Sequence, residues 1–169
     1  MKKFELTSEF ITNIFGKKLF RIKALVEFGS VKEGELGGFV EKEENLSHKG
    51  DAWVSGNAEV SGNAEVYGDA KVFGNAKVYG NAEVSGNAWV YGNAEVYGDA
   101  DYATVKGFGT EYRTTTFFKC RDRVTRVKCG CFYGDLEQFR NQVKNTRKGK
   151  IAEEYLMIAD LMEKHFKEE

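Results

Sequence analysis

The sequence predicts a mainly β protein built around a solenoid of parallel strands. The main observation is a six-residue unit, Val-x-Gly-Asn/Asp-Ala-x, that repeats without insertion from Val54 to Ala100. This period fits neither a helix nor a flat strand, whose apolar residues recur every 3.6 and every two positions. It fits a short extended piece followed by a corner, because glycine and asparagine enter left-handed backbone conformations at least cost. Three pieces and three corners close one triangular coil, and stacked coils pair their strands in parallel.

The repeat register extends beyond the regular units. Leu36 to Val40 still matches it, Leu46 lies where an alanine is expected, and Lys42 and His48 fall at positions that should point inward. The repeat resembles that of the hexapeptide-repeat family, whose fold is a left-handed parallel β-helix. We therefore expect such a β-helix of about four coils over residues 36–103.

Positions eighteen apart stack on one outer face of the predicted coil. One face collects both tryptophans and two other aromatic residues: Trp53, Phe73, Trp89 and Tyr91. Clustered exposed aromatic side chains mark contact sites, so we expect this face to be buried, either by the flanking segments or in a subunit interface. Hexapeptide-repeat proteins are typically homotrimers, so the resemblance implies a trimer first and a dimer second.

Residues 1–35 are predicted to form a β cap over the first open end of the coil, which would otherwise expose unpaired backbone groups. The strand-like stretches are Ile11–Phe15 and Leu19–Leu25, and Gly16-Lys17 between them suits a tight turn.

Two further segments follow the repeat. Residues 104–133 are predicted to form a loop and a basic β-hairpin, with strands at 113–120 and 124–129 joined through residues 121–123. Residues 134–169 are predicted to form a helical pair, because Gly134 to Glu137 places acids in a first turn. The second helix is expected from residue 151 to 166, with an apolar stripe of Ile151, Tyr155, Ile158, Leu161, Met162 and Phe166.

Charge is distributed unevenly along the chain. The net charge is −1, yet residues 113–150 hold eleven Lys/Arg and three Asp/Glu, a net charge of +8. Such a concentration favours anionic partners. The first residues show no secretory signal, and no apolar run reaches membrane-spanning length. Three cysteines, an odd number, argue against a disulfide framework, so we expect a cytoplasmic protein without a membrane partner.

The basic hairpin is the predicted ligand site, because the arginine fork suits phosphate and carboxylate groups. Its residues are Arg113, Lys119, Arg121, Arg123, Arg126 and Lys128. The expected partner is a small anionic nucleotide-like ligand or an acidic protein, and a merely solvated charged hairpin is the alternative. Nucleic acid is less expected, since the basic track is short. Charge reversal at Arg121 together with Arg126 should abolish binding.

The flanking segments resemble small proteins carried by phages and other mobile elements. The stretches concerned are LFRIKAL (19–25), GELGGFVEKEENL (34–46) and CGCFYGDLEQF (129–139). Several phage proteins of this size act against host defences, by blocking an enzyme or binding a nucleotide signal. The resemblance implies a non-catalytic binding protein in the host cytoplasm, with a host defence protein as the other partner.

Two other functions stay open. Many hexapeptide-repeat proteins are acyltransferases that use acyl-coenzyme A with a histidine base. That reading requires His48, since His165 lies among charged residues near the chain end. A structural or assembly module is the third reading.

A metal site is not predicted. A carbonic-anhydrase-like zinc site needs three histidines, and the chain has two. The spacing of Cys120, Cys129 and Cys131 does not match a zinc motif, so we expect buried, reduced cysteines and no resident cofactor.

Overall fold

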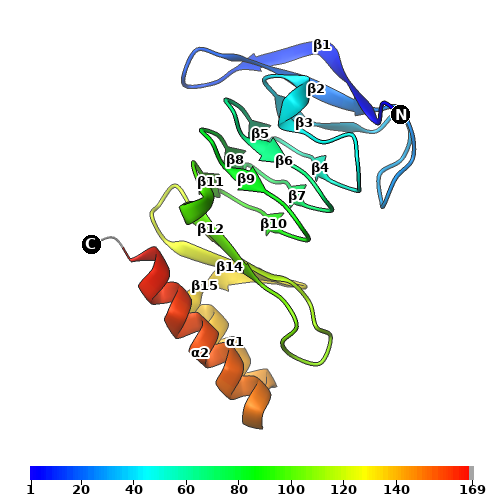
Figure 1. Cartoon of the computed structure of the whole chain (residues 1–169). Helices are drawn as coiled ribbons and strands as arrows, with labels where there is room; N and C mark the ends of the chain where they lie inside the picture. The colour runs from blue at the N-terminus through cyan, green and yellow to red at the C-terminus, as the bar shows by residue number, and fades with distance from the viewer. Residues whose placement is uncertain (168–169) are drawn as a thin grey trace.

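A computed structural model describes residues 1–167, so the last two residues of the predicted helical pair lie outside the described part. The repeat forms a solenoid of two-residue parallel strands that occupies the middle of the molecule (Figure 1). The strands are β4 (Trp53–Val54), β5 (Glu59–Val60), β6 (Glu65–Val66), β7 (Lys71–Val72), β8 (Lys77–Val78), β9 (Glu83–Val84), β10 (Trp89–Val90) and β11 (Glu95–Val96). Val60 pairs with Val78, eighteen positions on, as the period requires. The repeat valines from Val54 to Val96 and the alanines from Ala58 to Ala94 are fully buried, and the corner glycines from Gly56 to Gly92 all have positive φ.

The solenoid has about three turns, fewer than the four expected, because both ends are taken over by other structures. At the first end β3 (Leu36–Val40) hydrogen-bonds to β5 on one side and to the N-terminal sheet on the other. At the second end a short 3₁₀ turn (Asp99–Asp101) leads into β12 (Tyr102–Val105), which leaves the coil for another sheet. The inward placement of Lys42 was wrong, since this side chain is exposed.

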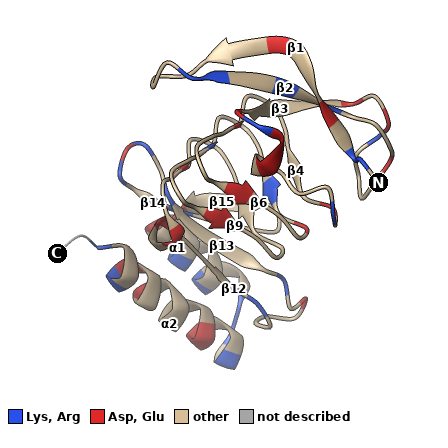
Figure 2. Cartoon of the chain, turned by 45° about the horizontal axis from the view of Figure 1, so that its top comes forward, with Lys and Arg blue, Asp and Glu red and all other residues tan. Residues whose placement is uncertain are grey.

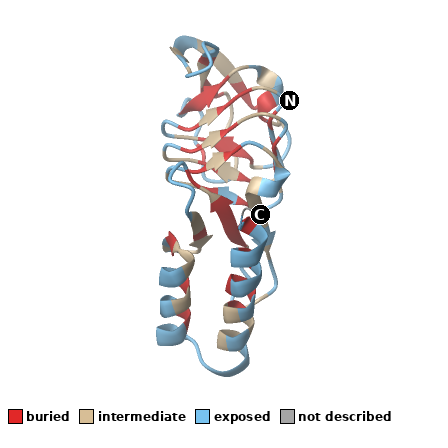
Figure 3. Ribbon diagram, turned by 90° about the vertical axis from the view of Figure 1, so that its left-hand side faces the viewer, coloured by how far each residue is buried: buried red, intermediate tan, exposed pale blue. Residues whose placement is uncertain are grey.

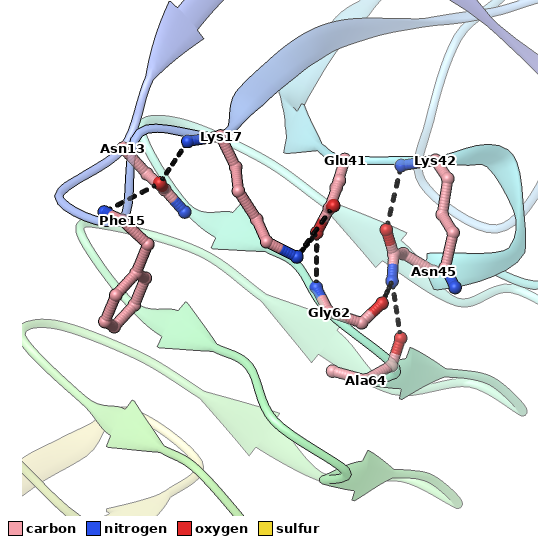
Figure 4. Close-up of polar contacts among 8 residues, drawn as sticks. All are labelled: Asn13, Phe15, Lys17, Glu41, Lys42, Asn45, Gly62 and Ala64. Carbon is pink, nitrogen blue, oxygen red and sulfur yellow. Dashed lines mark hydrogen bonds and ion pairs between the residues drawn. The ribbon is translucent and has the colours of Figure 1, made fainter.

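Asn45 and Leu46 fill the interior of the first coil instead, and both are buried. Asn45 lies in a 3₁₀ turn (Glu43–Asn45) and joins the irregular coil to the regular one (Figure 4). Its Oδ1 accepts a hydrogen bond from the backbone N–H of Lys42 at 2.9 Å, and its Nδ2 donates to the carbonyl oxygens of Gly62 (3.1 Å) and Ala64 (2.8 Å). A side-chain amide thus substitutes for strand pairing where the coil is irregular.

The N-terminal cap is a ribbon of β1 (Phe4–Thr12) and β2 (Lys18–Ala24), which extends the sheet to the order β1-β2-β3-β5-β8-β11. The first strand was predicted at Ile11–Phe15, but those residues mainly form the turn. Asn13 sets the turn, because its Oδ1 accepts the backbone N–H groups of Phe15 and Lys17, both at 3.0 Å (Figure 4). The ribbon is anchored to the first coil where Lys17 Nζ lies 2.9 Å from Glu41 Oε1.

The N-terminal segment also covers the first end of the aromatic face. Trp53 is 3% exposed, with Phe28 edge-on at 5.4 Å and Phe4 at 6.4 Å between ring centroids. The buried Lys3 donates from Nζ to the carbonyl oxygens of Gly50 (3.2 Å) and Ala52 (2.8 Å). The chain itself therefore covers Trp53.

The C-terminal cap is a four-stranded sheet in the order β12-β13-β14-β15, formed with β13 (Thr115–Lys119), β14 (Thr125–Cys129) and β15 (Phe132–Asp135). The predicted hairpin through residues 121–123 is its centre, whereas β12 and β15 were not foreseen. Alternation along β13 gives the sheet two apolar faces: Phe118 packs on the solenoid core and Phe117 on the helices. The backbone N–H of Trp89 donates to Thr116 Oγ1 at 3.0 Å, which satisfies an amide at the last coil.

Two helices, α1 (Leu136–Thr146) and α2 (Gly149–Phe166), cover the outer face of this sheet and run side by side (Figure 3). The predicted helix start is confirmed, because Asp135 is the N-cap and accepts from the backbone N–H of Gln138 at 2.8 Å. Of the predicted stripe, Tyr155, Ile158, Met162 and Phe166 are buried. Leu161 is 59% exposed, so its place in the stripe was wrong. Within residues 1–167, neither helix combines the length and apolar character needed to cross a membrane.

Candidate functional site

The predicted basic hairpin does not form one cluster. Three of its cations are engaged with acidic side chains: Lys119 with Asp101 (3.4 Å), Arg121 with Glu95 (3.1 Å) and Arg126 with Asp122 (2.6 Å). The backbone N–H of Val124 and the guanidinium of Arg126 hold the pKa of Asp122 below its usual value. Arg123 is exposed at the tip, with φ +62. The Arg126 pair lies within the hairpin, and the Lys119 and Arg121 pairs connect the hairpin to the end of the solenoid.

The other two predicted cations, Arg113 and Lys128, line a pocket where the last coil meets the C-terminal sheet. This junction pocket has a volume of about 540 Å³ and includes Trp89, Lys106, Tyr112, Arg113, Lys128 and Cys131. The loop from β12 to β13, which projects at the lower right of Figure 1, supplies Lys106, Tyr112 and Arg113. Among the described residues that line the pocket none is acidic, and in residues 1–167 its three cations form no ion pair with a carboxylate. The described residues that line the junction pocket therefore carry a net positive charge.

Aromatic rings form part of the junction pocket wall. Trp89 is 41% exposed in the single chain, so the flanking segments do not bury it, and Phe73 contacts its ring edge-on at 5.9 Å. Lys128 Nζ lies 5.6 Å from the Trp89 ring centroid, within cation–π range. Tyr112 is 66% exposed and has φ +49, a left-handed conformation that is costly for a bulky residue. Such strain is concentrated at ligand-binding sites, so Tyr112, like Trp89, is a candidate for stacking on an aromatic ring of a ligand.

Gly130 lines the junction pocket and contacts Lys128 through its carbonyl oxygen. It has φ +57 in the turn between β14 and β15, and its carbonyl oxygen accepts from Lys128 Nζ at 2.6 Å. A Cβ at this position would lie 2.5 Å from Arg113 Nη1. That atom is the end of a flexible side chain, so the positive φ of the turn is the stronger reason for glycine here.

The acidic side chains of the solenoid are found mainly on other faces. Glu65 and Glu83 are stacked neighbours on β6 and β9, where Figure 2 shows acidic positions. Glu59 pairs with Lys77 at 3.4 Å on a further face. The charge arrangement thus separates the acidic faces from the positive junction pocket.

His48 is held in place on both ring nitrogens. Its Nδ1 accepts the backbone N–H of Lys3 at 3.1 Å, and its Nε2 lies 2.7 Å from Glu43 Oε1. The ring stacks on Phe4 with centroids 4.3 Å apart. The hydrogen bond from His48 is the main reason why the pKa of Glu43 is lowered. A general base needs a free ring nitrogen near its substrate, and this geometry provides none.

The three cysteines occupy different surroundings. Cys120 is buried as expected, and burial raises the pKa of its thiol to about 11. Cys129 is partly buried, whereas Cys131 is exposed at the junction pocket, which the expectation of buried cysteines missed. Over the described residues, no three His, Cys, Asp or Glu side chains gather in a way that could hold a metal ion.

Sequence reasoning also missed Lys106 and Tyr112 as site residues. Both lie in the loop between β12 and β13, which has no periodic pattern, so only the folded arrangement brings them to Trp89. Comparison of the chain with models of protein families and with curated proteins gives no match.

Proposed function

We propose that the protein is a non-catalytic binding protein for a small anionic, nucleotide-like ligand, and that the junction pocket is the binding site. The observation that supports this proposal is the convergence of Lys106, Arg113 and Lys128, which form no ion pair within residues 1–167, on a pocket that also exposes Trp89. A planar guanidinium suits a phosphate group, and an exposed indole suits a stacked base.

The proposal moves the ligand site away from the tip of the hairpin. Arg121 and Arg126 are paired with Glu95 and Asp122, so their reversal to glutamate would break ion pairs without changing the lining of the junction pocket. Loss of binding is therefore expected from substitution of Arg113 or Lys128, and no longer from substitution of Arg121 and Arg126.

Tryptophan fluorescence tests the proposal directly. Trp53 is buried and Trp89 is exposed, so adenosine 5′-monophosphate should quench Trp89 and leave Trp53 unaffected. Trp89→Phe should remove the signal, and isothermal titration calorimetry should show weaker binding in that variant. Adenosine without phosphate should bind more weakly, because the cations would lose their partner.

Matched charge variants locate the site. Arg113→Gln and Lys128→Gln should each weaken binding of adenosine 5′-monophosphate about tenfold or more, since hydrogen bonds to charged groups contribute about 1.5–3 kcal/mol. Arg121→Gln is the control and should bind normally. The proposal is wrong if the unmodified protein binds no nucleotide, or if all three variants lose affinity equally.

An acidic host protein is the other proposed partner, and a pull-down follows if nucleotides do not bind. Only the resemblance of the flanking segments supports three further proposals: that a phage or mobile element encodes the protein, that it acts against host defence, and that it is located in the host cytoplasm. Homotrimer formation also stays a prediction, to be checked by native mass spectrometry. Phe4 and Phe28 cover Trp53 within the chain, which disfavours a subunit interface at this residue. No contact of His48 favours acyl transfer.

A further inference from the structure

A second pocket adjoins the junction pocket and shares Arg113 and Cys131 with it. This helix pocket has a volume of about 120 Å³ and lies between the β12–β13 loop and the helices; its residues include Phe108, Arg113, Phe139, Gln142, Arg147 and Tyr155. Arg113 therefore stands at the border between two pockets and not at the end of one.

The helix pocket differs from the junction pocket in chemical character. Its floor is apolar, because Phe139, Val143 and Tyr155 belong to the core between the sheet and the helices. Its rim combines Arg113 and Arg147 with the carboxylate of Glu111. It also includes the C-terminal end of α1, whose carbonyl groups carry partial negative charge. These features suit an uncharged ring better than a second phosphate.

The loop that forms the helix pocket is fixed to α2. Tyr155 Oη donates to the carbonyl oxygen of Phe108 at 3.1 Å. Gly109 has φ +74, and a Cβ there would lie 2.7 Å from Tyr155 Oη, so the loop passes close over the ring. The pocket is therefore formed in advance. Its volume is close to that of the ~150 Å³ protein cavity that holds benzene.

We propose that the natural ligand is a phosphodiester, in which Arg113 binds a bridging phosphate, a stacked base occupies the junction pocket and a second ring enters the helix pocket. This inference rests on the proposed function and adds that the phosphate of the ligand is esterified to a second group that carries a ring. A ligand with a terminal phosphate at Arg113 would leave the apolar helix pocket unused.

Adenosine 5′-monophosphate and its phenyl ester test this inference by isothermal titration calorimetry. The monophosphate carries a charge of about −2 near pH 7, and the ester keeps a single negative charge. Electrostatic attraction alone therefore predicts weaker binding of the ester. A ring bound in the helix pocket predicts the opposite, an ester that binds about tenfold more tightly.

Filling the helix pocket provides the second measurement. Gln142 is exposed at its rim, and Gln142→Trp should remove the advantage of the ester while leaving monophosphate binding unchanged. Asn141→Trp is the matched control, because Asn141 is exposed on α1 and does not line either pocket.

The outcomes separate the two proposals. If the monophosphate does not bind, the proposed function fails. If the monophosphate binds and the ester binds equally or less well, only the phosphodiester inference is overturned. It is also overturned if the ester keeps its advantage in Gln142→Trp, since the ring would then lie elsewhere.

Discussion

Replacement of Asn45 offers the sharpest test of how the irregular first coil is joined to the regular solenoid. The side chain is fully buried and makes three hydrogen bonds to backbone groups, one accepted and two donated. Asn45→Ala removes all three. At roughly 1 kcal/mol for each hydrogen bond, the free energy of unfolding should fall by about 3 kcal/mol. For a chain of this size, the melting temperature should fall by about 6–12 °C.

Asn45→Asp keeps the shape of the side chain but reverses the chemistry of Nδ2. An ionised carboxylate would face the carbonyl oxygens of Gly62 and Ala64 without a proton to donate. Near pH 7 this variant should therefore be less stable than Asn45→Ala, because a buried charge without a partner costs more than a lost hydrogen bond. The folded state would raise the pKa of this carboxyl above its unfolded value, so stability should be recovered as pH falls through the folded pKa.

Thermal unfolding followed by circular dichroism, at pH values between 4 and 7, measures both effects. Asn45→Asp should gain stability relative to Asn45→Ala as the pH falls. The reasoning fails if Asn45→Asp is as stable as the unmodified protein at pH 7, or if the difference between the two variants does not change with pH.

Three further predictions concern a buried lysine, the thiols and the coil corners. Burial and the nearby Lys71 lower the pKa of Lys3 to about 8 from 10.5. Between these pH values the unfolded chain binds more protons than the folded chain, so stability should rise with pH. Relative to Lys3→Met, the free energy of unfolding measured in urea should increase by about 2 kcal/mol from pH 8 to pH 10. A chromogenic disulfide reagent at pH 8 should modify Cys131 rapidly and leave Cys120, whose pKa is about 11, unmodified until the chain unfolds; equal rates would contradict the burial. Gly68→Ala should destabilise the fold more than Gly86→Ala. Both glycines have positive φ, which costs about 1–2 kcal/mol for alanine, but of the two only Gly68 would bring its new Cβ against a neighbour, the backbone nitrogen of Gly86 at 3.1 Å. Similar losses of stability in urea unfolding would refute this.

The solenoid could be predicted from the sequence because its information is local and repeated. Every six-residue unit has the same pattern of residues, and three units make one coil, so the pairing of Val60 with Val78 follows from their separation of eighteen positions. The helix start at Asp135 was equally readable, since capping depends on residues only a few positions apart.

The ends of the solenoid were harder to predict because their contacts are long-range and occur once. Nothing near Leu36 in the sequence shows that its strand pairs with β2, and nothing near Tyr102 shows that β12 joins β13. The same limit applies to the site. A run of cations signals charge, but only the fold shows that Glu95 pairs with Arg121, whereas Arg113 lines a pocket with Trp89 and has no ion pair among the described residues.

The solenoid also acts as a spacer of adjustable length. Both pockets lie at the C-terminal end of the solenoid, whereas the N-terminal ribbon joins the sheet at the opposite end through β3, with only its turn reaching Tyr79. Duplication of residues 53–70 would insert one more coil and displace the ribbon by about 4.8 Å, the usual distance between neighbouring strands. Ligand affinity should be unaffected by such an insertion. The reach of the molecule and its binding specificity are therefore separable properties, and either one could change in evolution or by design without altering the other.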